Sequence, residues 1–118
     1  MKKDDRLYLE HILDCITQVE RCVAYKKKKF IDDRILQDAI VRNLQVMAES
    51  TQKLSKSLKL NVTDIPWHSL SSFRDVLVHD YLGIDMDEIY QTIKSDLPKL
   101  KKKVKEILKF LKKKESDA

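Results

Sequence analysis

The sequence predicts an all-α protein, a helical bundle of roughly four or five helices. Its 118 residues include one glycine and two prolines, too few for the many turns that a β fold requires. Apolar residues recur at steps of three and four, whereas β-branched residues never alternate over a useful length. A chain of this length fits one domain, which we expect to span residues 1–118 around a single core.

The first helix is predicted from about Asp4 to Lys28, because one apolar stripe follows the helical repeat through this segment. The stripe consists of Leu9, Ile12, Leu13, Ile16, Val19 and Val23. The run at 30–33 breaks the repeat. Asp32 or Asp33 can cap the next helix, because an aspartate accepts hydrogen bonds from the free N–H groups of a first turn.

The second helix is predicted from about Arg34 to Leu58, followed by a polar connector at 59–64. Its apolar stripe consists of Ile35, Leu36, Ala39, Ile40, Val46, Met47, Ser50 and Leu54. Arg42 and Asn43 interrupt the stripe, and polar groups buried in a bundle need partners. One hypothesis is that they support a site by hydrogen bonding across the bundle.

The third helix is predicted from about Pro66 to His79, because proline suits a first helical turn. Its expected buried stripe consists of Trp67, Leu70, Phe73 and Leu77. Gly83, the only glycine, can end this helix or turn the chain just after it. Asp85 can then cap a fourth helix.

A last helix is predicted after Pro98, which separates it from the fourth or bends the two into one. Its apolar positions lie close to a heptad seam: Leu97, Leu100, Val104, Ile107, Leu108 and Leu111. The other faces are rich in lysine. Such faces are usually solvated, but lysines can also neutralise phosphates of a nucleic acid without reading its sequence.

The composition also limits the class of protein. No N-terminal segment resembles a signal peptide, and no apolar run approaches the roughly 18 residues of a membrane span. Cys15 and Cys22 would sit roughly 10 Å apart on one helix, too far for an intrachain disulfide. We therefore expect two reduced thiols in a cytoplasmic protein that has no membrane contact, no metal-ligand spacing and no cofactor.

Arg74, His79 and Tyr81 stand out because they are interleaved with the apolar run 76–78, which is expected to anchor the helix. Histidine can accept and donate a proton near neutral pH, and arginine offers a planar fork to phosphate oxygens. Together they would serve RNA cleavage in which the ribose 2′-hydroxyl is the nucleophile. A plainer interpretation remains open, in which Arg74 and His79 only complement the dipole at a helix C-terminus.

The spacing of this motif restricts its geometry. Arg74 and His79 lie five positions apart, so a straight helix would point them roughly 140° away from each other. Either the helix ends or bends before His79, or a second copy of the chain completes the site. A two-fold homodimer would place two such motifs face to face.

The pattern R-x-x-x-x-H-x-Y at Arg74, His79 and Tyr81 is similar to the signature of the HEPN superfamily, and specifically of HepT-type toxins. Further stretches resemble the same family along nearly the whole chain. They are Y-L-E-H-I-L (8–13), Q-D-A-I-V-R-N-L-Q-V-M-A-E-S (37–50), D-I-P-W-H-S-L (64–70), Y-L-G-I-D (81–85) and L-P-K-L (97–100).

The resemblance implies an all-α, homodimeric toxin of a type VII HEPN/MNT toxin–antitoxin pair, acting on RNA as a metal-independent endoribonuclease. It assigns catalysis to Arg74 and His79. It also implies that the partner, a minimal nucleotidyltransferase (MNT) antitoxin, inhibits the toxin by AMPylation of Tyr81. The residue after the arginine is commonly Asn in this family. Here it is Asp75, which can orient either catalytic side chain but whose charge could repel RNA.

Two further hypotheses come from other functional classes. The chain could be a catalytically weak or inactive relative that serves as binding partner and substrate of a nucleotidyltransferase. Alternatively, its lysine runs could make it a plain helical nucleic-acid binder, whose binding would be salt-dependent and independent of the motif. The remaining histidines, His11 and His68, are interpreted as packing or surface residues.

Overall fold

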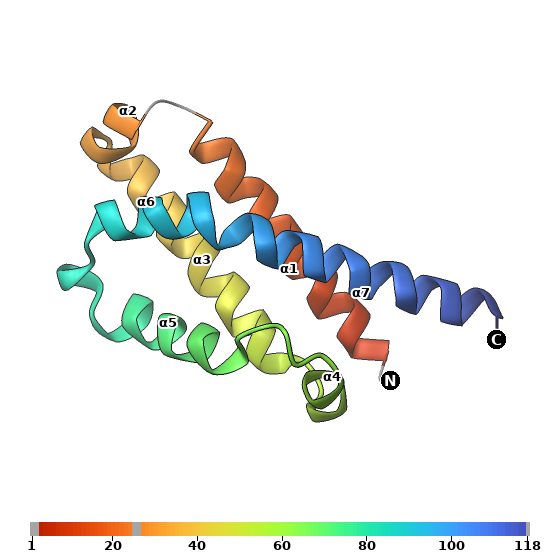
Figure 1. The fold of residues 1–118 in the computed structure, drawn as a ribbon. Helices are drawn as coiled ribbons and strands as arrows, with labels where there is room; N and C mark the ends of the chain where they lie inside the picture. The colour runs from red at the N-terminus through yellow and green to blue at the C-terminus, as the bar shows by residue number, and fades with distance from the viewer. Residues whose placement is uncertain (1–2, 25–26, 118) are drawn as a thin grey trace.

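The computed structural model describes residues 3–24 and 27–117, and this part of the chain is helical without any β-strand, as predicted. Figure 1 shows the arrangement of the helices. In chain order they are α1 (Lys3–Cys22), α2 (Lys27–Asp32), α3 (Arg34–Lys53), α4 (Lys56–Asn61), α5 (Trp67–His79), the 3₁₀ turn η1 (Tyr81–Gly83), α6 (Met86–Ser95) and α7 (Leu97–Asp117).

The centre of the bundle is the pair α1 and α3, which run antiparallel (Figure 1). Helix α7 packs on α1, and α5 packs on α3. The chain leaves α5 through η1 and returns along α6 into α7, so α5 and α6 lie on opposite sides of a gap between the ribbons (Figure 1). The C-terminal end of α7 extends beyond the rest of the bundle (Figure 1).

The core forms because each long helix turns one apolar stripe inward. The most deeply buried side chains are Leu9, Ile12, Ile16 and Val19 from α1, Phe30 from α2, Ile40, Leu44 and Met47 from α3, Leu58 from α4, Leu77 from α5 and Val104 from α7. The predicted stripe of the first helix is confirmed, except that Leu13 is only partly buried. The seam of α7 is buried as well, with Ile107 partly exposed.

The predicted stripe of the second helix was wrong at its N-terminal end. Ile35 is 82% exposed and Ala39 is also exposed, because both lie on a face of α3 that no other helix covers. The helix instead buries Val41, Leu44 and Ala48.

Two predicted helices are shorter than expected. The first ends at Cys22, and a separate helix starts at Lys27. The prediction of one helix that runs to Lys28 was therefore wrong. The second ends at Lys53, because Leu54 adopts an extended backbone with φ −63° and ψ 147°. Ser55 then caps α4, so the predicted break comes earlier than position 58 and the expected connector is partly helical.

The break after α3 is fixed by a contact that spans the sequence. The carboxylate of Asp5, on α1, accepts hydrogen bonds from the backbone N–H of Ser55 at 2.7 Å and from its hydroxyl at 2.6 Å. Asp5 is only 1% exposed, and a buried carboxylate is tolerated because its oxygens are satisfied in this way. The contact ties the end of α3 to the start of α1.

The predicted caps are confirmed. Asp33 accepts a hydrogen bond from the N–H of Leu36, and Asp85 accepts from the N–H groups of Asp87 and Glu88. Helices α6 and α7 are separate and meet at Asp96, so that Pro98 lies in the first turn of α7, where its missing N–H costs no hydrogen bond.

Both cysteines are free thiols, as predicted. Cys15 is buried in the core, and this burial, with a smaller contribution from the charge of Asp14, raises the pKa of its thiol.

Within the described part of the chain, no helix combines the length and the apolar character needed to cross a membrane.

Candidate functional site

Arg74 lies on the side of α5 that faces α3. Its Nη2 is 3.6 Å from Oε1 of Glu49 on α3, and its Nη1 donates to Oδ1 of the neighbouring Asp75 at 3.3 Å. The Arg74 side chain is 28% exposed, and its Nε is buried without a hydrogen-bond partner. Two carboxylates therefore hold the guanidinium, while one of its donors stays unsatisfied.

His79 is the last residue of α5, and its side chain is exposed. The helix is unbroken up to this point, because the N–H of Asp80 still donates to the carbonyl of Val76 at 3.0 Å. Of the two geometries that the spacing allowed, the prediction that the helix ends or bends before His79 is therefore wrong. The unbroken helix directs Arg74 and His79 to different faces of α5, roughly 140° apart.

Helix α5 is anchored to α3 by a row of polar side chains that sequence reasoning missed. Gln45 donates to the carbonyl of Leu77 at 2.8 Å, and Gln52 donates to the hydroxyl of Ser71 at 3.1 Å. Together with Glu49, these side chains recur at steps of four and three, which places them on one face of α3. This polar row was the available signal, but it also fits an ordinary solvated face.

The predicted support from Arg42 and Asn43 was wrong. The Asn43 amide donates to the carbonyl of Ala39 within its own helix, and Arg42 is exposed. His11 and His68 are exposed too, in agreement with their interpretation as surface residues.

The apolar residues around the motif are less buried than predicted. Leu77 is fully buried, whereas Val76 is 49% exposed and Val78 is 36% exposed, so the expectation that all three anchor the helix was wrong. In the predicted stripe of α5, Leu77 alone is buried, while Trp67, Leu70 and Phe73 are only partly buried. A helix that packs mainly on one neighbour buries only a narrow stripe.

The backbone of Tyr81 begins η1, but its side chain lies outside the part of the chain that the structure describes. The turn is closed by the N–H of Gly83, which donates to the carbonyl of Asp80 at 3.0 Å. A Cβ at position 83 would come within 2.6 Å of Oδ1 of Asp80, so glycine suits this close approach. Leu82, between Tyr81 and Gly83, is 95% exposed.

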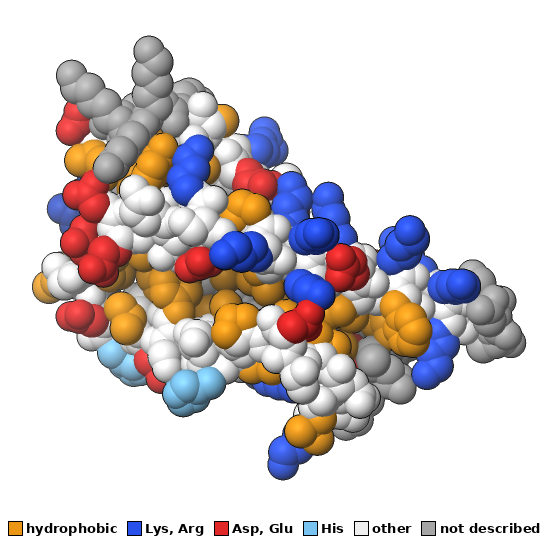
Figure 2. Space-filling view, in the orientation of Figure 1, with side chains coloured by type: hydrophobic (Ala, Val, Ile, Leu, Met, Phe, Trp, Pro, Cys, Tyr) orange, Lys and Arg blue, Asp and Glu red, His pale blue; other side chains and the backbone are white. Residues whose placement is uncertain are grey.

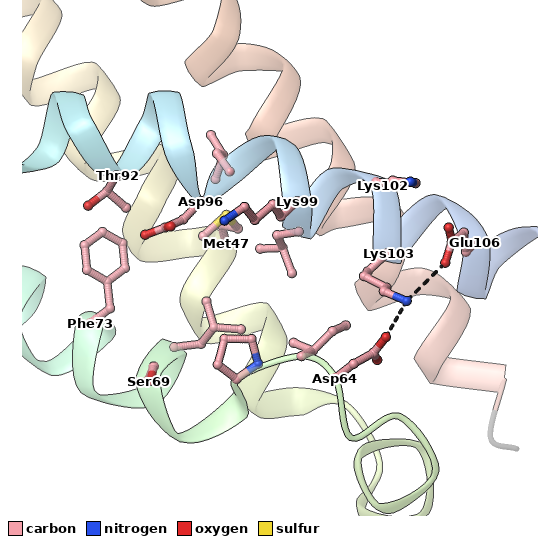
Figure 3. Close-up of a pocket in the computed structure, with 15 residues that line it drawn as sticks. Met47, Asp64, Ser69, Phe73, Thr92, Asp96, Lys99, Lys102, Lys103 and Glu106 are labelled. Carbon is pink, nitrogen blue, oxygen red and sulfur yellow. Dashed lines mark ion pairs between the residues drawn. The ribbon is translucent and has the colours of Figure 1, made fainter.

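A separate groove of about 720 Å³ opens between α5 on one side and α6 and α7 on the other. Figure 2 shows a band of hydrophobic side chains in the hollow between these helices. Met47, Leu70, Phe73 and Leu100 contribute apolar surface, and lysines of α7 stand on the rim (Figure 3). Neither Arg74 nor His79 lines this groove.

One ion-pair cluster bridges the groove. Lys103 of α7 contacts Asp64, in the loop before α5, and lies 3.5 Å from Glu106 (Figure 3). The hydrogen bond from Lys103 lowers the pKa of Asp64, and the same hydrogen bond raises the pKa of Lys103. Among the described residues, no three His, Cys, Asp or Glu side chains converge as they would to bind a metal ion.

Comparison with known proteins identifies the family. Residues 12–107 match the family model described as ribonuclease HepT-like. A relative from Caldanaerobacter subterraneus subsp. tengcongensis, provisionally named an RNase, is 37% identical over 107 residues, which cover 90% of this chain and 96% of the relative. A relative from Thermococcus cleftensis, provisionally named ribonuclease HepT, is 31% identical over 112 residues, covering 92% of this chain and all of the relative.

A longer relative from Methanocaldococcus jannaschii is named gamma-glutamylcyclotransferase and, provisionally, RNase. It is 34% identical over 115 residues, which cover 94% of this chain, and the chain spans 50% of that relative's length. No solved structure gives a significant match. The family match covers most of the chain, and relatives of the same length align along almost all of it. The chain belongs to the HepT-like ribonuclease family of HEPN proteins.

Proposed function

We propose that this protein is the toxin of a HEPN/MNT toxin–antitoxin pair and acts as a metal-independent endoribonuclease. Its site would be composed from two copies of the chain. Arg74 and His79 would be its catalytic residues, and Asp75 would orient the arginine. The observation that carries the proposal is the position of Arg74 and His79 on one unbroken helix of a chain that belongs to this family.

The two side chains suffice for a complete cleavage cycle. His79 accepts the proton of a ribose 2′-hydroxyl, and the 2′-oxygen attacks the adjacent phosphorus. The bond from phosphorus to the 5′-oxygen then breaks, and the departing oxygen takes a proton from an imidazolium, leaving a 2′,3′-cyclic phosphate and a 5′-hydroxyl. Arg74 stabilises the negative charge that builds up on the phosphoryl oxygens.

The direction of the side chains supports a site made from two copies. Arg74 is held toward α3 by Glu49, whereas His79 is exposed at the end of α5, so one copy alone does not bring them together. Val76, Val78 and Leu82 lie exposed around the motif and offer apolar surface to a second copy. A two-fold axis beside α5 would set the arginine of each copy near the histidine of the other.

Inhibition would occur at Tyr81, which follows His79 by two positions at the start of η1. An MNT-type nucleotidyltransferase would transfer AMP from ATP to the tyrosine hydroxyl and release pyrophosphate. The added phosphate places negative charge and bulk beside the site, where phosphates of RNA must lie. Intact mass, measured after incubation with the partner and ATP, should rise for the wild-type chain but not for Tyr81→Phe.

A second candidate is a weakly active or inactive relative that serves mainly as substrate and binding partner of the nucleotidyltransferase. The observation in its favour is that Arg74 already contacts two carboxylates, Glu49 and Asp75, which offset its positive charge. A purified chain that is AMPylated by its partner but cleaves no RNA would favour this candidate.

Cleavage of single-stranded RNA by the purified chain, in the presence of a chelator, tests the leading proposal. His79→Ala should abolish cleavage, while His68→Ala should leave it intact. His68 is a matched control, because it is an exposed histidine on the same helix. Cleavage retained by His79→Ala would remove histidine from the mechanism.

A further inference from the structure

Helix α7 carries a dense row of positive charge along its exposed side. Residues 99–114 hold nine lysines and one acidic residue, Glu106, which is far from the balance of a typical solvated helix. Figure 2 shows Lys side chains along the whole visible length of α7. Lys99 and Lys102 are exposed, and no described residue forms an ion pair with either of them.

An aromatic side chain lies within this basic surface. Phe110 is 61% exposed, which is unusual for so large an apolar ring. At roughly 100° per residue, Lys99, Lys103, Phe110 and Lys113 fall within about 40° of one line along α7. Lys99 and Lys103 line the groove, so Phe110 lies on the groove side of the helix, beyond the groove's end.

A second aromatic ring lines the groove itself. Phe73 of α5 stands in the groove and faces Thr92 of α6 (Figure 3). Phe73 directly precedes Arg74 on the same helix, so a molecule that contacts this ring touches the turn that carries the proposed catalytic arginine. We call Phe73, Lys99, Lys102, Phe110 and Lys113 the lysine–phenylalanine track.

Aromatic rings interleaved with unpaired lysines match the chemistry of an unpaired nucleic-acid strand. Bases of a single strand stack on aromatic side chains, while lysines follow its phosphates. Bases inside a duplex are already stacked on each other and cannot reach Phe73 or Phe110. An acidic protein helix could pair with the lysines, but it would have no use for an aromatic ring in the groove that directly precedes the proposed catalytic arginine in the chain.

We propose that the lysine–phenylalanine track binds single-stranded RNA that flanks the cleaved bond. The proposal rests on the proposed ribonuclease function and adds where the rest of the substrate lies. The expected substrate is therefore unpaired RNA that extends beyond the two nucleotides joined by the scissile phosphate.

The acidic residues near the track are largely engaged. Asp64 and Glu106 both contact Lys103, so this lysine neutralises part of their charge and is itself not free to bind phosphate. Asp96 also lines the groove and opposes binding near its α6 end. The strongest attraction for RNA is therefore expected along α7, from Lys102 toward Lys113.

Binding is measured in the His79→Ala chain, so that the RNA stays intact. The fluorescence anisotropy of a labelled single-stranded RNA of mixed sequence reports the affinity. Phe110→Ala should weaken binding about tenfold, through loss of base stacking. Lys102→Gln and Lys113→Gln, combined, should weaken it by a similar factor and reduce its dependence on salt.

Two variants serve as matched controls. Lys105→Gln removes one positive charge from the same helix, half of the change in the paired variant, and Lys105 points roughly 120° away from the line through Lys99, Phe110 and Lys113. Ile35→Ala removes another exposed apolar side chain, this one from α3. Each control should change the affinity by less than about twofold, because neither residue belongs to the track.

The proposal is overturned if Lys105→Gln weakens binding as much as the paired lysine variant does, or if Phe110→Ala has no effect. It is also overturned if a duplex of the same sequence binds as tightly, or if the chain binds anionic vesicles but no RNA. Failure of the ribonuclease proposal looks different. In that case the wild-type chain cleaves nothing, while the track variants still reduce RNA binding.

Discussion

Glu49 on α3 and Arg74 on α5 form an ion pair across the helix interface, with Nη2 of the arginine 3.6 Å from Oε1 of the glutamate. The contact fixes the direction of the guanidinium from a second helix. Because the Nε of Arg74 is buried and unpartnered, the arginine is not placed where its own hydrogen bonds would be best satisfied. Glu49 is therefore a candidate positioning residue for the proposed catalytic arginine.

Glu49→Ala should lower the rate of RNA cleavage about ten- to a hundredfold, because small misplacements of a catalytic group are costly. Glu49→Gln should recover much of this loss, since an amide oxygen can still accept from the guanidinium. The folding free energy should change by less than about 1 kcal/mol, as is usual for a partly exposed pair.

Glu10→Ala is the matched control, because it removes an exposed glutamate that pairs with Arg6 on α1. It should leave the cleavage rate unchanged. If Glu49→Ala cleaves RNA as fast as the wild-type chain, Glu49 has no positioning role.

Asp75→Asn should lower the KM for RNA, because it removes a negative charge that is 3.3 Å from Arg74 while keeping an oxygen that can accept its hydrogen bond. The effect should shrink as salt is added, since the Asp75 carboxylate is 59% exposed and well screened. Steady-state kinetics at two salt concentrations measure this. A higher KM would show that the aspartate itself assists the reaction.

The ion pair between Lys103 and Asp64, which bridges the groove, makes the stability of the fold depend on pH. The hydrogen bond from Lys103 lowers the pKa of Asp64, so the stabilisation is present above the unfolded carboxyl pKa and is lost as pH falls through the lowered folded value. The pKa of Lys103 is raised, so its stabilisation depends on pH in the opposite direction and is lost only as pH rises through the raised folded value. The pair therefore stays closed throughout the neutral range.

An NMR titration of the Asp64 carboxyl should give a midpoint below the ordinary value of 3.8, and Lys103→Gln should move it back up. Equal midpoints in the two proteins would contradict the bridge. At neutral pH, Asp64→Asn should also tighten binding of single-stranded RNA, because it releases Lys103 to the lysine–phenylalanine track.

Leu77→Ala should destabilise the fold by about 2–5 kcal/mol, because the Leu77 side chain is fully buried where α5 packs on α3 and its own carbonyl accepts the hydrogen bond from Gln45. Val76→Ala removes an apolar side chain from the same helix that is 49% exposed, and it should cost far less. Urea denaturation of both variants measures the difference. Equal losses would mean that α5 is seated differently on α3.

The sequence predicted most of the fold, because apolar stripes and capping residues are local signals. Asp33 and Asp85 cap the helices that their positions indicated. The break at Leu54 was missed, since it depends on Ser55 contacting the carboxylate of Asp5, a residue distant in the sequence. Ile35 was placed in the core because periodicity shows which residues share a face, but not whether another helix covers it.

The candidate site was predictable only in part. Arg74 and His79 were singled out by their chemistry and spacing, and the family resemblance assigned catalysis to them. The unbroken helix excludes a helix that ends or bends before His79, which spacing alone had left open. Glu49 and the glutamines beside it could not be singled out, because they look like any other polar residues on a half-exposed helix. Their contact with α5 exists only once the bundle has formed.

Subunit complementation tests the composite site most directly. Arg74→Ala and His79→Ala chains, each inactive alone, are denatured together in equal amounts and refolded. If each site takes its arginine from one copy and its histidine from the other, half of the dimers are mixed and each holds one intact site. The mixture should then recover about a quarter of the wild-type cleavage rate. A mixture in which mixed dimers form but no RNA is cleaved would contradict a site shared between two copies.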